Sequence, residues 1–205
     1  MDWPRAIARN SEALKGVIEV LFAMLGLGSG DTPARISSTL HRAVLRLLQP
    51  AESVLRRLIV TAARGLVVKV ATPRPMLAKP IGRPIVKGKR LRASFQLFDT
   101  RKDFTREFNR VFDQNFLSQP ERMMDASPLT QRLQILKSTL DDLPRHALRF
   151  ARWRLRRENL KNPKFRSPFR PGPAPGHRRK KTHEVDELLT ECQWLAHYAM
   201  KPDTS

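Results

Sequence analysis

Arginine and lysine side chains gather in one stretch of the chain, where they could bind the phosphate groups of a polyanion. Fourteen of the residues from 145 to 181 are Lys or Arg and only Glu158 is acidic, so this stretch holds +13 of the formal net charge of +20. Cations at this density favour condensed anions, because each phosphate that they neutralise releases counterions. The indicated chemistry is therefore phosphate binding, and it implies nothing about base sequence.

Four of these arginines recur at the spacing of one helix edge. Counted at ~100° per residue, their side chains project within an arc only ~60° wide. The apolar residues of the same stretch fall on the broad opposite side, so the helix can dock on a bundle and show these arginines outward. An ordinary solvated face is the alternative, but the repulsion between like charges along this edge favours an external anion. The four residues are Arg145, Arg149, Arg152 and Arg156.

The segment from 163 to 182 continues this charge without an acidic residue and contains five prolines. Such a sequence buries too little surface to fold alone, so we expect a partly disordered basic tail. Phe165 and Phe169 stand among its cations and are candidates to stack on unpaired bases; the alternative is that they anchor the tail to its own domain. The cations that we expect to contact phosphates are Arg166, Arg170, Arg178, Arg179, Lys180 and Lys181.

No catalytic or metal-binding signature accompanies these cations. The chain has no Walker, HExxH, GxSxG or kinase-type motif. Its single cysteine, Cys192, falls on an apolar helix face with no base at a suitable spacing. The histidines nearest to it are too sparse for a zinc site with four ligands. We therefore expect a non-enzymatic protein without a metal or a cofactor.

Cysteine usage also bears on the compartment. One cysteine cannot form an internal disulfide, which fits a reducing environment, and we expect a cytoplasmic protein. The first residues do not make a convincing signal peptide, since Asp2 is acidic and the apolar run that follows contains Glu19. Neither this run nor the one at 54–70 approaches the ~20 clean apolar residues that span a bilayer.

Apolar residues recur at helix spacing in the first part of the chain. The pattern predicts helices over 10–25 and 33–48, and a third helix that opens at Pro50. The glycines of 26–30 are typical of a C-cap and a linker. Five arginines fall mostly off the apolar faces, so we expect a solvated surface, with a second anion-binding surface as the alternative. These are Arg42, Arg46, Arg56, Arg57 and Arg64.

The middle of the chain holds three further patterns. Prolines and cations alternate over 73–90 and predict a basic, extended linker between two halves of the chain. Apolar residues alternate over 91–98 and predict a short strand. The helix pattern that follows has phenylalanines four residues apart, which are typical of a core stripe and otherwise of a groove for a partner. They are Phe104, Phe108, Phe112 and Phe116.

The C-terminal part predicts three further helices. Ser127 and Pro128 open the first, and Asp141 and Asp142 cap the basic helix after it. The last helix covers 183–200 and has acidic residues in its first turn. We expect it to supplement the core; the alternative is that it folds back on the neighbouring HRRKK cluster and competes with the polyanion.

Together these patterns predict a mainly α protein with small helical bundles, proline-rich basic linkers and a partly disordered basic segment. The expected function is binding of DNA or RNA through non-specific phosphate contacts. A helical adaptor for an acidic protein is the first alternative, and binding to an anionic membrane surface is the second. The expected divisions are a helical segment over 1–72, the linker over 73–90, a helical segment over 91–162, the basic tail over 163–182 and an acidic amphipathic helix over 183–205.

Overall fold

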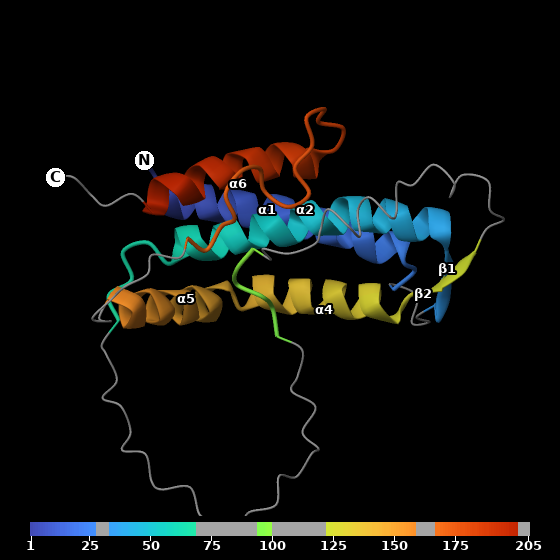
Figure 1. Cartoon of the computed structure of the whole chain (residues 1–205), viewed down its shortest axis with the longest axis horizontal. Coiled ribbons are helices and arrows are strands. Elements are labelled where there is room, and N and C mark those ends of the chain that lie inside the picture. The colour runs from blue at the N-terminus through green and yellow to red at the C-terminus, as the bar shows by residue number, and fades with distance from the viewer. Residues whose placement is uncertain (28–32, 69–93, 100–121, 159–166, 201–205) are drawn as a thin grey trace, which may run out of the picture.

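Helices dominate the structure. The computed structural model describes residues 1–27, 33–68, 94–99, 122–158 and 167–200. Two short strands among them, β1 (Arg35–Ser37) and β2 (Met123–Asp125), pair antiparallel with Ile36 opposite Met124. The prediction of a mainly α protein is confirmed (Figure 1). The helices of the described residues are α1 (Trp3–Met24), α2 (Ser38–Ala62), α4 (Ser127–Asp141), α5 (Leu143–Glu158) and α6 (Glu184–Met200).

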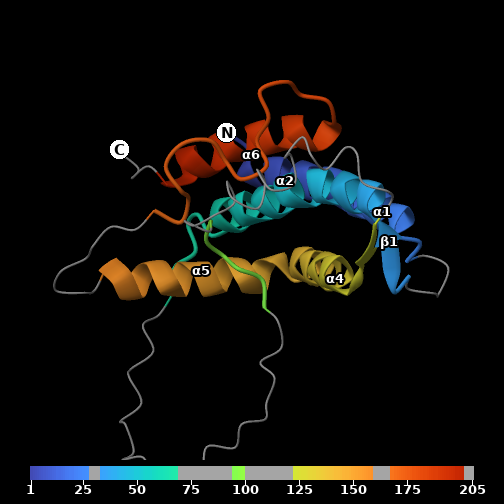
Figure 2. The ribbon, with the colours of Figure 1, turned by 45° about the vertical axis from the view of Figure 1, so that its right-hand side comes forward.

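α2 is the central helix, and each of the other four packs against it. In Figures 1 and 2, α6 lies on one side of the layer that α1 and α2 form, while α4 and α5 follow one another on the other side. Residues 50–61 of α2 are all buried. One hydrophobic core joins side chains from all five of these helices, so helices from both halves of the chain share a single interior.

Carboxylates accept hydrogen bonds at the starts of two helices. The Asp2 carboxylate accepts a hydrogen bond from the Arg5 N–H at 3.0 Å, so α1 begins well before the predicted residue 10. Asp125 Oδ1 accepts hydrogen bonds from the Ser127 N–H at 2.9 Å and from the Ser127 hydroxyl at 2.8 Å, just before the predicted start of α4. Because these bonds favour the charged carboxylate, they lower the pKa of Asp125.

α2 continues through Pro50, where the sequence predicted that a new helix opens. A proline inside a helix has no N–H for the carbonyl four residues earlier, which here belongs to Arg46. The Arg178 guanidinium donates a hydrogen bond to this carbonyl at 2.9 Å instead. The prediction of a helix boundary at Pro50 is therefore wrong, because a residue distant in the sequence supplies the missing hydrogen bond.

The segment that carries Arg178 packs closely on the same part of α2. The Ser53 hydroxyl donates a hydrogen bond to the Pro175 carbonyl at 2.7 Å. Gly176 has a φ of +81°, and a Cβ at this residue would lie 2.6 Å from the Pro50 nitrogen. Only glycine avoids both the backbone strain and this clash, so the segment is matched to the surface of α2 around the proline.

Residues 167–182, for which a partly disordered tail was expected, pack against α2. They form neither helix nor strand, yet Phe169 and Ala174 are buried in the core. The tail need not fold alone, because α2 supplies the apolar surface and the hydrogen-bond partners that its own sequence lacks. The linker predicted at 73–90 and residues 163–166 lie outside the described residues.

Residues 94–99 lie in the core without forming a strand, so the strand predicted at 91–98 is wrong for the described part. The expected alternation holds, since Phe95 and every second residue after it are buried. A side chain takes the place of a neighbouring strand here, because Arg56 Nε donates a hydrogen bond to the Gln96 carbonyl at 3.1 Å. The predicted phenylalanine stripe lies outside the described residues.

Two arginines that were expected at the surface are buried. Arg57 has 0% of its surface exposed and Arg56 has 6%. The Arg57 guanidinium donates to both carboxylate oxygens of Asp99, through Nη2 at 3.0 Å and Nη1 at 3.4 Å. Arg56 lies 3.7 Å from the same carboxylate and 3.5 Å from that of Glu52. The solvated surface predicted for these two residues is wrong, because other segments cover residues 50–61 of α2 on all sides.

Arg57 also joins parts of the chain that are distant in the sequence. Nη1 donates to the Ser53 carbonyl at 2.9 Å, and Nε donates to the Gln193 side chain on α6. The Phe169 ring centroid lies 4.7 Å from the guanidinium carbon. Burial lowers the pKa of Arg57, and the Asp99 charge opposes this shift. One side chain thus holds two helices and two irregular segments together.

α6 supplements the core, as expected. Its start is capped by Asp186 Oδ2, which accepts hydrogen bonds from the backbone N–H groups of Thr182 at 3.1 Å and His183 at 3.2 Å. Glu191 pairs with Arg9 on α1, and not with the HRRKK cluster. Detachment of α6 would expose its whole apolar face. The predicted members of that face are all buried: Val185, Leu188, Leu189, Cys192, Leu195, Ala196 and Ala199.

Cys192 provides a chemical test of this packing. Its side chain is fully buried, and burial raises the pKa of the thiol to about 12. Because the thiolate is the reactive species, we expect no labelling by a thiol reagent near neutral pH in the folded protein and rapid labelling in denaturant. Labelling of the native protein at the denatured rate would show that α6 does not stay docked.

The buried ion pair predicts a large loss of stability when one partner is removed. Asp99→Asn leaves the Arg57 charge buried without its carboxylate, and such changes cost about 3 to 5 kcal/mol in the free energy of unfolding. Urea denaturation measures this loss. Glu12→Gln is the control, because Glu12 pairs with Lys15 at 3.1 Å with 77% of its side chain exposed, and an exposed pair contributes at most about 1 kcal/mol. Equal losses in the two variants would contradict the structural role of the buried pair.

Candidate nucleic-acid interface

α5 docks on α2 through its apolar side, which leaves the other side for the predicted arginine edge. Trp153 extends this apolar side, with its ring centroid 5.5 Å from that of Phe150 and 4.7 Å from that of Phe98. The packing fixes the rotation of the helix about its axis, and therefore which residues face outward. The buried residues of α5 are Leu143, Ala147, Phe150 and Ala151.

Four arginines, Arg145, Arg149, Arg152 and Arg156, occupy the outward side of α5, and we call them the arginine row. All four are exposed. Arg145 pairs with Asp142 at 3.3 Å, although its side chain stays 82% exposed. The other three make no ion pair or hydrogen bond with any residue that the structure describes. The row therefore presents guanidinium groups that the described part of the fold does not use.

The two remaining arginines of α5 lie at the edges of the row. Arg154 Nε is 3.7 Å from the Glu158 carboxylate, and the Arg157 guanidinium carbon is 5.4 Å from the Trp153 ring centroid. Both are half-buried. They are held by neighbours on their own helix, so the outward cations of α5 are the four of the arginine row.

His146 lies beside the arginine row, and the charges of the row affect its pKa. Burial lowers the pKa of His146, and the positive charges of Arg149 and Arg145 lower it further, while Asp142 acts in the opposite direction. Its Nδ1 is buried and has no hydrogen-bond partner among the described residues. His146 is therefore neutral near pH 7 and can report on any anion that screens the neighbouring arginines.

Two of the cations predicted to bind phosphates take part in the fold itself. Arg170 Nε donates to the Pro173 carbonyl at 2.9 Å, and Arg178 donates to the Arg46 carbonyl next to Pro50. These contacts use guanidinium donors that the prediction assigned to phosphates. Arg166 lies outside the described residues.

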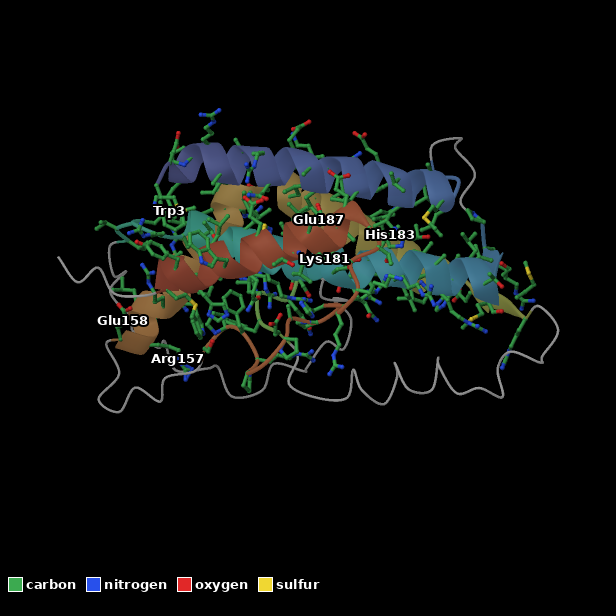
Figure 3. All side chains as sticks on the ribbon, turned by 90° about the horizontal axis from the view of Figure 1, so that it is seen from above. Trp3, Arg157, Glu158, Lys181, His183 and Glu187 are labelled. Carbon is green, nitrogen blue, oxygen red and sulfur yellow. The ribbon has the colours of Figure 1, made fainter. Side chains whose placement is uncertain are left out.

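Arg179, Lys180 and Lys181 are exposed, as a phosphate-binding role requires, but they lie apart from the arginine row. They belong to the loop before α6, where Figure 3 labels Lys181. α5 and α6 are on opposite sides of the layer formed by α1 and α2 (Figures 1 and 2). Among the described residues, the basic groups of α5 and those before α6 therefore form two separate surfaces.

Phe169 is not available to stack on bases. Only 4% of its surface is exposed, and its ring lies between the Arg57 guanidinium and the His197 ring, whose centroid is 5.7 Å away. The alternative from the sequence, that this phenylalanine anchors the tail, is the one that the structure shows. The second stacking candidate, Phe165, lies outside the described residues.

Among the described residues, no three His, Cys, Asp or Glu side chains come close enough together to hold a metal ion. Within the same ranges, no helix is long and apolar enough to cross a membrane. Cys192 is buried, and its thiol pKa is raised, so it has the properties of a core residue and not of a nucleophile.

Sequence reasoning missed an exposed aromatic surface at one end of the bundle. Trp194 and Tyr198 lie four residues apart on α6, off its apolar face, and Trp3 from the other end of the chain stacks on Tyr198. The spacing of the two α6 residues is visible in the sequence. The contribution of Trp3 is not, because nothing in the sequence indicates that the start of α1 meets the end of α6.

A histidine titration tests whether the arginine row receives an anion. In the free protein, His146 should titrate below about pH 6.5, the ordinary value. A bound polyanion offsets the charges of Arg149 and Arg145, so the pKa of His146 should rise, and NMR of the ring protons would measure it. The unfolded chain binds more protons than the folded one below the ordinary pKa, so His146 lowers stability in acid and a bound polyanion reduces this loss.

His41 is the internal control for this titration. Burial and the Arg132 charge lower its pKa, so it starts from a similar environment away from α5. It should keep its pKa when the polyanion is added. A rise at both histidines, or at neither, would contradict binding at the arginine row.

Comparison with known proteins does not add to the argument from the site. No protein-family model, no curated protein and no solved structure matches this chain. The exposed cations of α5 and their surroundings therefore carry the functional proposal on their own.

Proposed function

We propose that this protein binds DNA or RNA without catalysing a reaction, through non-specific contacts between the arginine row and backbone phosphates. The observation that carries the proposal is the set of four exposed guanidiniums on one rigid helix, three of which have no partner in the described part of the chain. Guanidinium groups suit this role because they bind phosphate oxygens in a bidentate manner and stay charged at any physiological pH.

The dimensions of the row fit a short stretch of backbone. Arg145 and Arg156 are eleven residues apart, which is a distance of roughly 16 Å along a helix axis. One strand of a duplex advances about 3.4 Å per nucleotide, so the row is about as long as five nucleotides. The helix places its guanidiniums at regular intervals along this length, and α2 prevents the helix from rotating away.

The charges around the row support the same proposal. α5 has only one acidic residue, Glu158 at its last position, and this residue pairs with Arg154. Arginines at this spacing repel one another by about 0.2 to 0.5 kcal/mol per pair, and phosphates between them would remove that repulsion. The net charge of +20 adds a long-range attraction that brings a polyanion to the protein.

Replacement of the arginine row by glutamine should flatten the salt dependence of binding. Each phosphate contact contributes about −0.9 to the slope of log K against log salt for duplex DNA and about −0.7 for single strands. The variant with Arg145, Arg149, Arg152 and Arg156 all changed to Gln should therefore lose roughly 3 to 4 units of slope. Fluorescence anisotropy with labelled oligonucleotides between about 50 and 200 mM salt measures it.

A second variant with the same change in net charge separates local contacts from general attraction. Four exposed cations lie outside α5, and their replacement by Gln removes four positive charges away from this helix. They are Lys15, Arg35, Arg122 and Lys137. This variant should keep most of the slope. If both variants lost the same amount, the arginine row would have no special part in binding, and if the unmodified protein did not bind either nucleic acid, the proposed function would be wrong.

A further inference from the structure

Three aromatic rings form a column on the surface where α1 begins and α6 ends. The Trp3 and Tyr198 centroids are 5.8 Å apart with 29° between the ring planes, and the Trp194 and Tyr198 centroids are 5.6 Å apart with 21° between them. The Arg64 guanidinium carbon lies 4.5 Å from the Trp3 centroid. The order of contacts is therefore Arg64, Trp3, Tyr198 and Trp194, and we call these four residues the aromatic column.

The column is closed at one end and open at the other. Arg64 covers Trp3, which is half-buried. Trp194 is 57% exposed and Tyr198 is 47% exposed. Among the described residues, no ring or cation stacks on Trp194 other than Tyr198. The next flat group that could continue the stack would have to come from outside these residues.

α6 does not need these exposed rings for docking. Its apolar face, from Val185 to Ala199, is buried against α1 and α2, and Trp194 and Tyr198 lie off that face as neighbours four residues apart. An indole of this size is a large apolar surface to leave in water. The packing of α6 therefore gains little from these two exposed aromatic side chains.

The surrounding charges favour an anionic partner. Arg5 and Arg9 are exposed on the first turns of α1, and Arg9 is paired with Glu191. The acidic first turn of α6 is at the other end of that helix, and Figure 3 shows Glu187 well separated from Trp3. α5 ends at the same end of the bundle as the column (Figures 1 and 3). The column and the end of α5 thus lie at the same end of the bundle, on opposite sides of the layer that α1 and α2 form.

We propose that the aromatic column binds an unpaired base of single-stranded nucleic acid, which stacks on the exposed ring of Trp194. This inference rests on the proposed function and adds a strand preference to it. Every base has a flat face that can extend a stack of rings, so the contact needs no particular base sequence. Bases in a duplex are already stacked and paired, so the column should favour single strands.

The test compares ligands that differ only in their bases. The full-length protein is mixed with a labelled deoxyadenylate strand of about 15 nucleotides, near the upper size bound by one small single-strand-binding domain, with an abasic strand of equal length, and with the matching duplex. Trp194→Leu should weaken binding of the deoxyadenylate strand roughly 5- to 150-fold. The affinities of this variant for the abasic strand and the duplex should stay within about twofold of those of the unmodified protein, because these two ligands offer no free base face.

Two further variants separate stacking from folding. Trp194→Phe keeps a flat ring and should lose less affinity than Trp194→Leu. Tyr198→Leu removes the ring that supports Trp194 and should weaken binding of the deoxyadenylate strand only. In each variant, continued protection of Cys192 from a thiol reagent would show that α6 is still docked.

The results distinguish this inference from the proposed function. Equal binding of the deoxyadenylate and abasic strands by the unmodified protein, or an unchanged affinity in Trp194→Leu, would overturn the role of the column and leave phosphate binding by α5 intact. An equal loss for all three ligands in Trp194→Leu would also overturn it, since that pattern does not depend on bases. Failure of the unmodified protein to bind any of the ligands would overturn both proposals.

Discussion

The buried contact between Arg57 and Asp99 is the constraint on which the rest of the structure depends. A guanidinium in the core must be matched by a carboxylate and by acceptors for its remaining N–H groups, because an unpaired buried charge costs several kcal/mol. Asp99 and Gln193 meet that need from two segments far from α2 in the sequence. The requirement of one side chain for partners thus fixes the place of 94–99 and of α6 around the central helix.

The structure around Pro50 also depends on a distant residue that supplies a missing hydrogen-bond partner. The proline leaves the Arg46 carbonyl without its usual partner, and Arg178 provides the missing donor. Gly176 allows the backbone of the same segment to lie against the proline ring. Both cases show arginine used as a cross-link inside the protein, so the total of 39 lysines and arginines overstates the number of cations that a partner could contact.

The exposed cations that do not take part in such internal contacts lie on separate surfaces of the protein. α5 combines an apolar side that α2 holds in place with an outward side of guanidiniums, so its phosphate-binding groups are fixed relative to one another before any ligand arrives. The cluster before α6 is exposed on the opposite side of the bundle. The aromatic column lies where α5 also ends, which brings groups suited to phosphates and groups suited to bases to one end of the molecule.

The sequence by itself determined the mainly helical character of the chain and the arginine row, because both follow from the period of the α-helix and need only residues within a few turns of one another. The starts of α4 and α6 were likewise readable from Ser127, Pro128 and the acidic turn after His183. Only the tertiary structure decided that Arg57 is buried, that Phe169 is an anchor and that α2 continues through Pro50. Each of these outcomes depends on a partner more than 40 residues away in the sequence, and local periodicity holds no information about which distant segment will supply it.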